Sequence, residues 1–446
     1  MDDIKISVVI PVYNASATLM PCLEAIYSSS CIPFEVIAVD DCSSDNSIEL
    51  ASAYTDKIIE LEGGPFGPAY ARNRGVNKAQ GDIVLFIDCD VVVHPDTIQK
   101  VKQTFDSDPE MDATFGSYDD TPSEGEFLSQ YKNLIHHFVH QGAQEDGGTF
   151  WAGCGAIKRG VFLDMGGFDE ERYARPSIED IELGYRLNAS GSKIYVNKAV
   201  QVKHLKRWSL SSWLKTDIFS RAIPWTALIF QARDLPDDLN LGISQRYSAF
   251  LLIVWMLAVL LTFDFNLMLL LPLFWFLCLL VLSKCNPQNG VQFFHINRVE
   301  GVMIGLIFLG LFGAAYYLNE YLFLLPLSWV FITTLAGVLV PSGSTGYKSV
   351  LFALIVVGFF FGFGALLAGS SIWLAVFSLI LLLIILVLNK QLFGFFTRKR
   401  GLFFVAATIP FQLTYYIYSM AAFVVGGGVY LLNTQLNKHK LNEDKK

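Results

Sequence analysis

The second half of this chain has very few acidic side chains. Residues 248–446 contain five Asp and Glu against 11 Lys and Arg, whereas residues 1–247 contain 36 acidic and 22 basic side chains. The acid-poor half also carries long apolar runs without interior charge, which is typical of membrane-spanning helices. We therefore predict an acidic, water-soluble domain followed by an all-α transmembrane domain with about six to eight helices.

Paired cysteines, basic clusters and a signal peptide are also lacking in the first half. The seven cysteines form no CxxC pair, which argues against a zinc site and a disulfide framework. The acidic excess excludes a nucleic-acid partner, because phosphate neutralisation needs clustered Lys and Arg. The seven Lys and Arg between residues 248 and 400 fall in the loops 284–298, 341–348 and 390–400. By the positive-inside rule, this predicts a multi-pass protein of the cell (plasma or inner) membrane with residues 1–246 cytoplasmic.

Strand and helix patterns alternate along the first half. Apolar strand patterns at 5–10, 34–39, 57–61 and 82–87 are separated by segments with helical spacing. This alternation predicts an α/β fold in which helices cover both faces of a mostly parallel sheet.

Two of these strands end in pairs of carboxylates. Residues 34–39 run into Asp40-Asp41, and residues 83–87 run into Asp88-Cys89-Asp90. Open α/β sheets bind ligands beyond the carboxyl ends of their strands. Because adjacent carboxylates there are costly without a cation, we expect Mg²⁺ or Mn²⁺ to hold an anionic ligand such as a diphosphate.

Six short motifs occur in a specific order. They are Pro11-Val12-Tyr13-Asn14, Asp40-Asp41-Cys42-Ser43-Ser44-Asp45, Ala71-Arg72-Asn73-Arg74-Gly75, Asp88-Cys89-Asp90, Gly166-Gly167-Phe168-Asp169 and Ile178-Glu179-Asp180. Together they resemble the motifs of family 2 glycosyltransferases over residues 4 to about 230. The resemblance implies a GT-A fold with a Rossmann-like nucleotide-binding sheet. It also implies an inverting, metal-dependent transfer from a nucleotide sugar, most often UDP-linked.

The resemblance assigns roles residue by residue. It implies donor binding by Pro11, Tyr13, Asp41, Arg72 and Asp88, metal coordination by Asp90, and general base catalysis by Asp180. Acidic residues also stabilise the first turn of a helix, so Ser177, Glu179 and Asp180 are alternatively a helix start without catalytic function.

The segment His204-Leu205-Lys206-Arg207-Trp208 resembles the QxxRW segment of processive polysaccharide synthases, with His in place of Gln. His204 is predicted either as a further metal ligand or as an ordinary interface residue. We expect Trp151, Gly153, Glu179, Arg207 and Trp208 on the acceptor side of the site. His136 and His140 have the spacing of metal ligands on a helix, but no acid joins them at zinc-protease spacing.

Four segments follow from these patterns. We expect a cytoplasmic GT-A domain at 1–203, an interfacial amphipathic segment at 204–246, a transmembrane domain at 247–432 and a polar tail at 433–446. The predicted function is transfer of a sugar from a nucleotide sugar to a lipid-linked or membrane-proximal acceptor. A processive polysaccharide synthase is the alternative, and a transporter or flippase with a non-catalytic, nucleotide-sensing domain is a second one.

Overall fold

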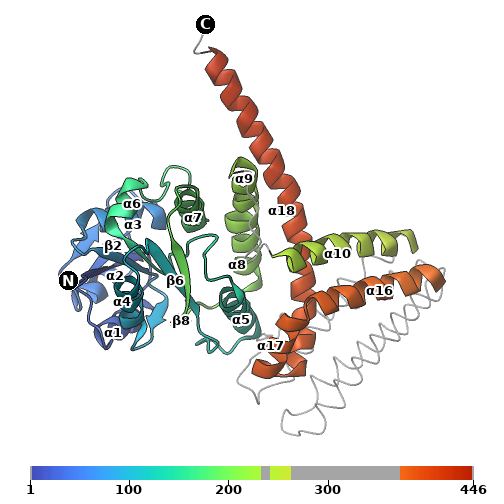
Figure 1. Cartoon of the computed structure of the whole chain (residues 1–446), viewed down its shortest axis with the longest axis horizontal. Helices are drawn as coiled ribbons and strands as arrows, with labels where there is room; N and C mark the ends of the chain where they lie inside the picture. The colour runs from blue at the N-terminus through green and yellow to red at the C-terminus, as the bar shows by residue number, and fades with distance from the viewer. Residues whose placement is uncertain (1–2, 233–241, 263–371, 444–446) are drawn as a thin grey trace. The chain divides into compact units, whose positions relative to one another are not determined.

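The computed structural model of this protein describes residues 3–232, 242–262 and 372–443 (Figure 1). The chain divides into two compact units. The first contains residues 1–124, 132–243 and 421–446, and the second contains residues 125–131 and 244–420. Every residue with a predicted donor, metal, catalytic or acceptor role belongs to the first unit.

An eight-stranded mixed sheet, in the order β3-β2-β1-β4-β7-β6-β8-β5, forms the centre of the first unit. Its strands are β1 (Ile6–Val12), β2 (Glu35–Asp40), β3 (Ile58–Glu60), β4 (Ile83–Ile87), β5 (Val91–Val93), β6 (Ala113–Tyr118), β7 (Cys154–Lys158) and β8 (Ile194–His204). The first four strands in the sheet order are parallel, and β7 runs antiparallel to both β4 and β6. In the other half, β6 is parallel to β8 and β8 is antiparallel to β5. The prediction of a mostly parallel sheet is therefore correct for the first four strands, and the whole sheet is mixed.

Helices cover both faces of this sheet, as predicted (Figure 1). One face packs against α1 (Leu19–Tyr27), α2 (Ser47–Ser52) and α4 (Thr97–Ser107), and the other against α3 (Pro68–Lys78), α6 (Arg159–Asp164) and α7 (Glu179–Ala189). Successive residues of a strand point to opposite faces. Accordingly, Val8 and Ile10 of β1 share a core with Leu23 of α1, whereas Val9 shares one with Val76 of α3.

The carboxyl ends of β1, β2 and β4 lie at one edge of the sheet. In the parallel pairs, Val12 is opposite Asp40, and Val9 is opposite Phe86. Tyr13, Asp41 and Asp88 follow these strands directly. The expectation that the acids after the second and fourth strand patterns share an edge is thus confirmed.

Four further helical segments precede or follow the remaining strands of the first unit. They are α5 (Phe127–Gly142), α8 (Leu210–Lys215), the π-helix η1 (Thr216–Ala222) and α9 (Ile223–Ala232). Trp213, which lies in the segment predicted to be interfacial and amphipathic (204–246), is 2% exposed. Ser209 caps α8, where its hydroxyl accepts a hydrogen bond from the Ser212 N–H.

The C-terminal half contains α10 (Ile243–Thr262), α16 (Ile372–Leu388), α17 (Lys390–Arg400) and α18 (Leu402–Glu443). Among the helices that the structure describes, Leu402–Leu432 is long and apolar enough to cross a bilayer, and the α16–α17 pair, bent by 67°, would be a second candidate. The sequence of the predicted transmembrane domain contains apolar runs at 267–283, 301–318, 322–340 and 349–368 that count as predicted spans, and these four runs lie outside the described residues. The multi-span domain of six to eight helices is therefore not supported by the described helices. The predicted polar tail also continues α18, which ends at Glu443.

Candidate active site

Arg72 connects the acidic end of β4 to the start of α7. This α3 side chain is buried, and its Nη2 donates a hydrogen bond to Asp88 Oδ1 at 2.6 Å while its Nη1 donates to Glu179 Oε1 at 3.0 Å. Burial alone would lower the pKa of Arg72, but the charges of Asp88 and Glu179 outweigh it and raise the pKa. A permanent cation therefore fixes the Asp88 carboxylate, whose side chain is 31% exposed.

The two carboxylates of the Asp88-Cys89-Asp90 motif have different environments. Burial raises the pKa of Asp88 above its ordinary value, although the charge of Arg72 opposes this rise. Burial also acts to raise the pKa of Asp90, but the neighbouring His204 side chain and, after it, the charge of Lys206 outweigh burial, so the pKa of Asp90 is lowered. Asp90 is consequently the more readily ionised of the two.

Asp90 and His204 are the residues of this site that fit a divalent cation. Asp90 Oδ2 lies 3.6 Å from His204 Nε2, so the two atoms can face one ion. Within residues 3–232, 242–262 and 372–443, no group of three or more His, Cys, Asp and Glu side chains is placed to bind a metal. Mg²⁺ in nucleotide sites is nevertheless usually held by one or two carboxylates, with substrate phosphates and water completing its coordination. The pair therefore suits a cation that arrives with a diphosphate.

Asp180 faces the strand side of α7. Its Oδ2 accepts a hydrogen bond from the Ala152 N–H at 3.0 Å, and its Oδ1 accepts one from the Ile181 N–H at 2.8 Å. Burial and the neighbouring charge of Glu179 raise the pKa of Asp180 to about 6. The carboxylate is thus held in place but remains largely ionised at neutral pH, which suits a general base.

Glu179 has a different position from its neighbour. Its Oε2 accepts from the Ser177 N–H at 2.9 Å, and its Oε1 receives the bond from Arg72. Ser177 does not cap α7 with its hydroxyl as the sequence suggested, because that hydroxyl donates to the Ser220 carbonyl at 2.8 Å. The two acids of the motif therefore have different positions. Glu179 is a buried partner of Arg72, and Asp180 faces the edge where Asp88 lies.

Two glycines allow close packing, one between α7 and the Phe150 backbone and the other against the Trp151 ring. A Cβ on Gly184 would lie 2.3 Å from the Phe150 nitrogen, and a Cβ on Gly153 would lie 2.5 Å from Trp151 Cζ2. The Gly153 carbonyl also accepts a hydrogen bond from the Asp88 N–H at 3.3 Å. Gly153 thus joins the Asp88 backbone to the Trp151 ring.

The predicted nucleotide end is built from the loops after β1 and β2. Tyr13 is half exposed, and Pro11 is partly buried at the end of β1. The Asp41 carboxylate accepts hydrogen bonds from the Phe66 N–H at 2.8 Å and the Gly67 N–H at 2.7 Å. Asp41 therefore shapes the turn before α3, and a contact with a base ring N–H would use its remaining lone pairs.

A stack of rings, which sequence reasoning missed, joins His204 to Trp151. Tyr118 lies between His204 and His136 at ring distances of 4.1 and 4.2 Å, and His136 contacts Trp151 at 4.7 Å and His140 at 3.9 Å. Burial lowers the pKa of His136 well below its ordinary value and the pKa of His140 to about 4. Both imidazoles are therefore neutral at pH 7. Their four-residue spacing on one helix face was the available signal.

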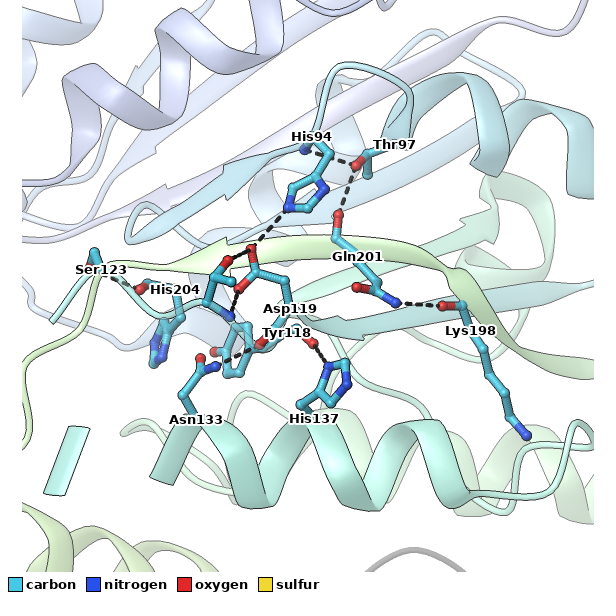
Figure 2. A network of polar contacts seen from close by, with 11 residues as sticks. His94, Thr97, Tyr118, Asp119, Ser123, Asn133, His137, Lys198, Gln201 and His204 are labelled. Atoms are coloured by element: carbon cyan, nitrogen blue, oxygen red, sulfur yellow. Dashed lines mark hydrogen bonds and ion pairs between the residues drawn. The ribbon is translucent and has the colours of Figure 1, made fainter. Parts of the chain in front are cut away.

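Figure 2 shows how the segment after β6 is held beside this stack. The Asp119 carboxylate pairs with His94 Nε2 at 3.0 Å, and the Asp119 carbonyl accepts from Asn133 at 2.7 Å. His137 Nδ1 bonds the Tyr118 carbonyl at 2.7 Å, and the Ser123 hydroxyl donates to the His204 carbonyl at 3.1 Å. These bonds fix α5 and the end of β8, and thereby the positions of Tyr118 and His204.

The other two acceptor-side residues differ in exposure. Trp208 is 5% exposed, with the Lys206 and Lys132 ammonium groups 4.6 and 5.5 Å from its ring centroid. Arg207 is exposed. Trp208 is therefore a buried side chain with two cations beside its ring.

Residues 7–166, which include the β1, β2 and β4 motifs of this site, match the family described as Glycosyl transferase family 2. The match ends before α7, so Asp180 and His204 lie beyond it.

Several curated proteins are similar to part of this chain. The uncharacterized glycosyltransferase YibD of Escherichia coli is 37% identical over 94 residues, which are 20% of this chain and 27% of that protein. The poly(ribitol-phosphate) beta-N-acetylglucosaminyltransferase TarS of Staphylococcus aureus is 32% identical over 101 residues, 21% of this chain and 18% of TarS. An uncharacterized glycosyltransferase of Haemophilus influenzae is 28% identical over 223 residues, 46% of this chain and 71% of that protein. The chain thus matches only about a quarter or less of the length of the first two relatives.

Two solved structures also align with this chain. The mannosyltransferase PcManGT of Pyrobaculum calidifontis, in complex with GDP-Man and Mn²⁺, aligns with a TM-score of 0.39 and 19% identity, over 52% of this chain and 65% of that one. TarS residues 1–349 with UDP-GlcNAc align with a TM-score of 0.36 and 22% identity, over 46% of this chain and 59% of that one.

Proposed function

We propose that this chain is an inverting glycosyltransferase that moves a sugar from a nucleotide sugar to a lipid-linked or membrane-proximal acceptor. The observation that carries the proposal is the placement of Asp180. Its carboxylate has a pKa raised to about 6 and is held by the Ala152 N–H, two residues before the Cys154 that pairs with the end of β4. A base and an acidic, cation-fitting motif therefore lie at one sheet edge.

The proposed reaction is a single displacement at the anomeric carbon of the donor sugar. The acceptor hydroxyl oxygen forms a bond to that carbon as the bond from the carbon to the diphosphate oxygen breaks. The hydroxyl proton passes to the Asp180 carboxylate, and the nucleoside diphosphate leaves with the electron pair of the broken bond. Attack on the face opposite the leaving group inverts the configuration.

The remaining residues hold the donor in this scheme. Tyr13, Pro11 and Asp41 would contact the nucleoside, and Asp88 would contact the ribose from a position fixed by Arg72. Asp90 and His204 would hold Mg²⁺ or Mn²⁺, which would neutralise charge on the departing diphosphate. Because Asp90 and His204 already lie within 3.6 Å, little rearrangement is needed to present both to one ion.

The acceptor would approach from the side of Trp151, Gly153, Arg207 and Trp208. Two features support a membrane-proximal acceptor: the helix Leu402–Leu432, which is long enough to span a bilayer, and the apolar sequence between it and the sheet domain. Curated relatives are named for transfer to poly(ribitol-phosphate), so an acceptor that contains phosphate groups is also consistent with the family. We place the sheet domain on the cytoplasmic side of a multi-pass protein, as the basic loops suggest.

The proposal is tested by Asp180→Asn in the purified full chain. Asn keeps the size of the side chain but cannot accept the proton, so sugar transfer should fall by about 10²–10⁴-fold while the donor still binds. Asp164→Asn, an exposed carboxylate at the end of α6, is the matched control and should retain transfer. Near-native transfer by Asp180→Asn would refute the assignment of the base and leave Asp180 with the helix-start function.

A further inference from the structure

Three cationic side chains gather beside the ring stack, in a domain that is acidic overall. Lys132 on α5, Lys206 after β8 and Arg221 on η1 come from three separate segments. The Lys132 and Lys206 ammonium groups both lie within 5.5 Å of the Trp208 ring centroid. Like charges repel, so a grouping of this kind is unfavourable unless anions offset it.

The Asp217 carboxylate lies next to two of these cations, Lys132 and Arg221. Asp217 Oδ2 accepts from Lys132 Nζ at 2.6 Å and from Trp213 Nε1 at 2.7 Å. Arg221 Nη1 is 3.7 Å from Asp217 Oδ1, which is beyond hydrogen-bond distance. Asp217 is therefore committed mainly to Lys132, whereas the Arg221 side chain is 48% exposed and only loosely paired with it.

The weak ion pair with Asp217 does not explain the position of Arg221. An exposed ion pair at this distance contributes little to stability, yet the charge of Arg221 acts on the interior of the site. After burial and the charge of His140, it lowers the pKa of His136 further. The Arg221 guanidinium is therefore near enough to His136 for its charge to act on that imidazole.

The backbone around Arg221 also has an unusual conformation. Asp217 and Arg221 lie on η1 (Thr216–Ala222), a π-helical turn between α8 and α9. Such turns are rare and energetically unfavourable, and they occur frequently at functional sites.

We propose that Lys132 and Arg221 form a binding site for a phosphate ester group of the acceptor. This inference rests on the proposed function, since it specifies which chemical group the transferase recognises on its acceptor. Arg221 would donate paired N–H groups to phosphate oxygens, which suits the planar guanidinium. Lys132, already fixed by Asp217, would add a point charge. The bound phosphate would place the acceptor hydroxyl between Trp151 and Asp180.

The test uses calorimetry on the purified full chain in detergent micelles. The probes are geranyl phosphate, glycerol 3-phosphate and geraniol, the last of which has the same chain as the first but no phosphate. We expect the phosphate probes to bind and geraniol not to bind. Binding of geranyl phosphate alone identifies a lipid headgroup, and equal binding of both phosphates identifies a phosphate ester without lipid preference.

Variants at Arg221 then locate the site. Arg221→Gln should weaken phosphate binding by about tenfold or more, because a charge-assisted hydrogen bond is lost, and Arg221→Lys should restore part of the affinity. Lys215→Gln, which removes an exposed positive charge from the preceding α8, should bind as the native chain does. Equal losses in Arg221→Gln and Lys215→Gln, or equal binding of geraniol, would overturn the proposal.

Nucleotide controls separate this inference from the proposed function. The native chain is titrated with UDP- and GDP-sugars plus Mn²⁺, and the absence of donor binding would count against the proposed function alone. Phosphate probes should bind equally well when UDP is already present. If UDP displaces them, the cations belong to the donor diphosphate site, and the acceptor assignment is wrong.

Discussion

Asp180→Asn should make the protein more stable at neutral pH while removing its activity. The folded protein raises the pKa of Asp180 to about 6 from an ordinary value of 3.8. A raised pKa in the folded state means that folding opposes ionisation of this carboxyl. Stability from Asp180 is therefore fully present below pH 3.8 and is lost as pH rises through about 6.

The expected change in the free energy of unfolding follows from the pKa shift of Asp180. A difference of about two pKa units corresponds to roughly 3 kcal/mol, and solvent screening of this partly exposed side chain reduces it to about 2 kcal/mol. Asn can accept from only one of the N–H groups of Ala152 and Ile181, which costs about 1 kcal/mol. The variant should thus be more stable by about 1 kcal/mol at pH 7 and less stable by a similar amount near pH 4.

Thermal unfolding of the full chain in detergent, at several pH values between 4 and 8, measures this reversal. For a domain of this size, about 1 kcal/mol shifts Tm by about 2–4 °C, so the Tm difference between variant and native chain should change by about 4–8 °C over this pH range. Asp164→Asn is again the control for removal of one negative charge from the acidic domain. A Tm difference that stays constant with pH would refute the view that Asp180 is held in an environment that opposes its charge.

Three other predictions concern the cation site, the Arg72 bridge and the membrane topology. Asp90→Ala should weaken binding of a nucleotide sugar in Mn²⁺, and a chelator should weaken it equally for the native chain; calorimetry that finds the same affinity with and without metal would contradict this. Arg72→Met should destabilise the protein by about 3–5 kcal/mol because Asp88 and Glu179 lose their shared cation, whereas Arg74→Met, which breaks a more exposed pair with Glu170, should cost about 1 kcal/mol or less in the same thermal assay. A cysteine placed at exposed Thr397, beside Arg398-Lys399-Arg400, should react with an impermeant maleimide only after cells are permeabilised; labelling of intact cells would disprove the cytoplasmic placement of this segment.

The sequence alone determined the local elements and the polarity of their ends. The apolar pattern of a run such as Ile83–Ile87 is enough to predict a buried strand. Where neighbouring strands are parallel, the acids that follow them must lie at the carboxyl edge of the sheet. The order of motifs also predicted the resemblance to family 2 glycosyltransferases, which a family match over residues 7–166 supports, because each motif is a short continuous segment. These properties depend on residues close together in the chain, which is why a single sequence reveals them.

The tertiary structure decided which side chains meet. Glu179 and Asp180 are adjacent and chemically alike, yet contact with Arg72, which is 107 positions away from Glu179, turns one inward and leaves the other at the sheet edge. The same holds for the stack of Tyr118, His136 and Trp151, and for the antiparallel entry of β7 that makes the sheet mixed. Such contacts depend on strand order and packing between distant segments, and the alternation of apolar and polar residues does not encode them.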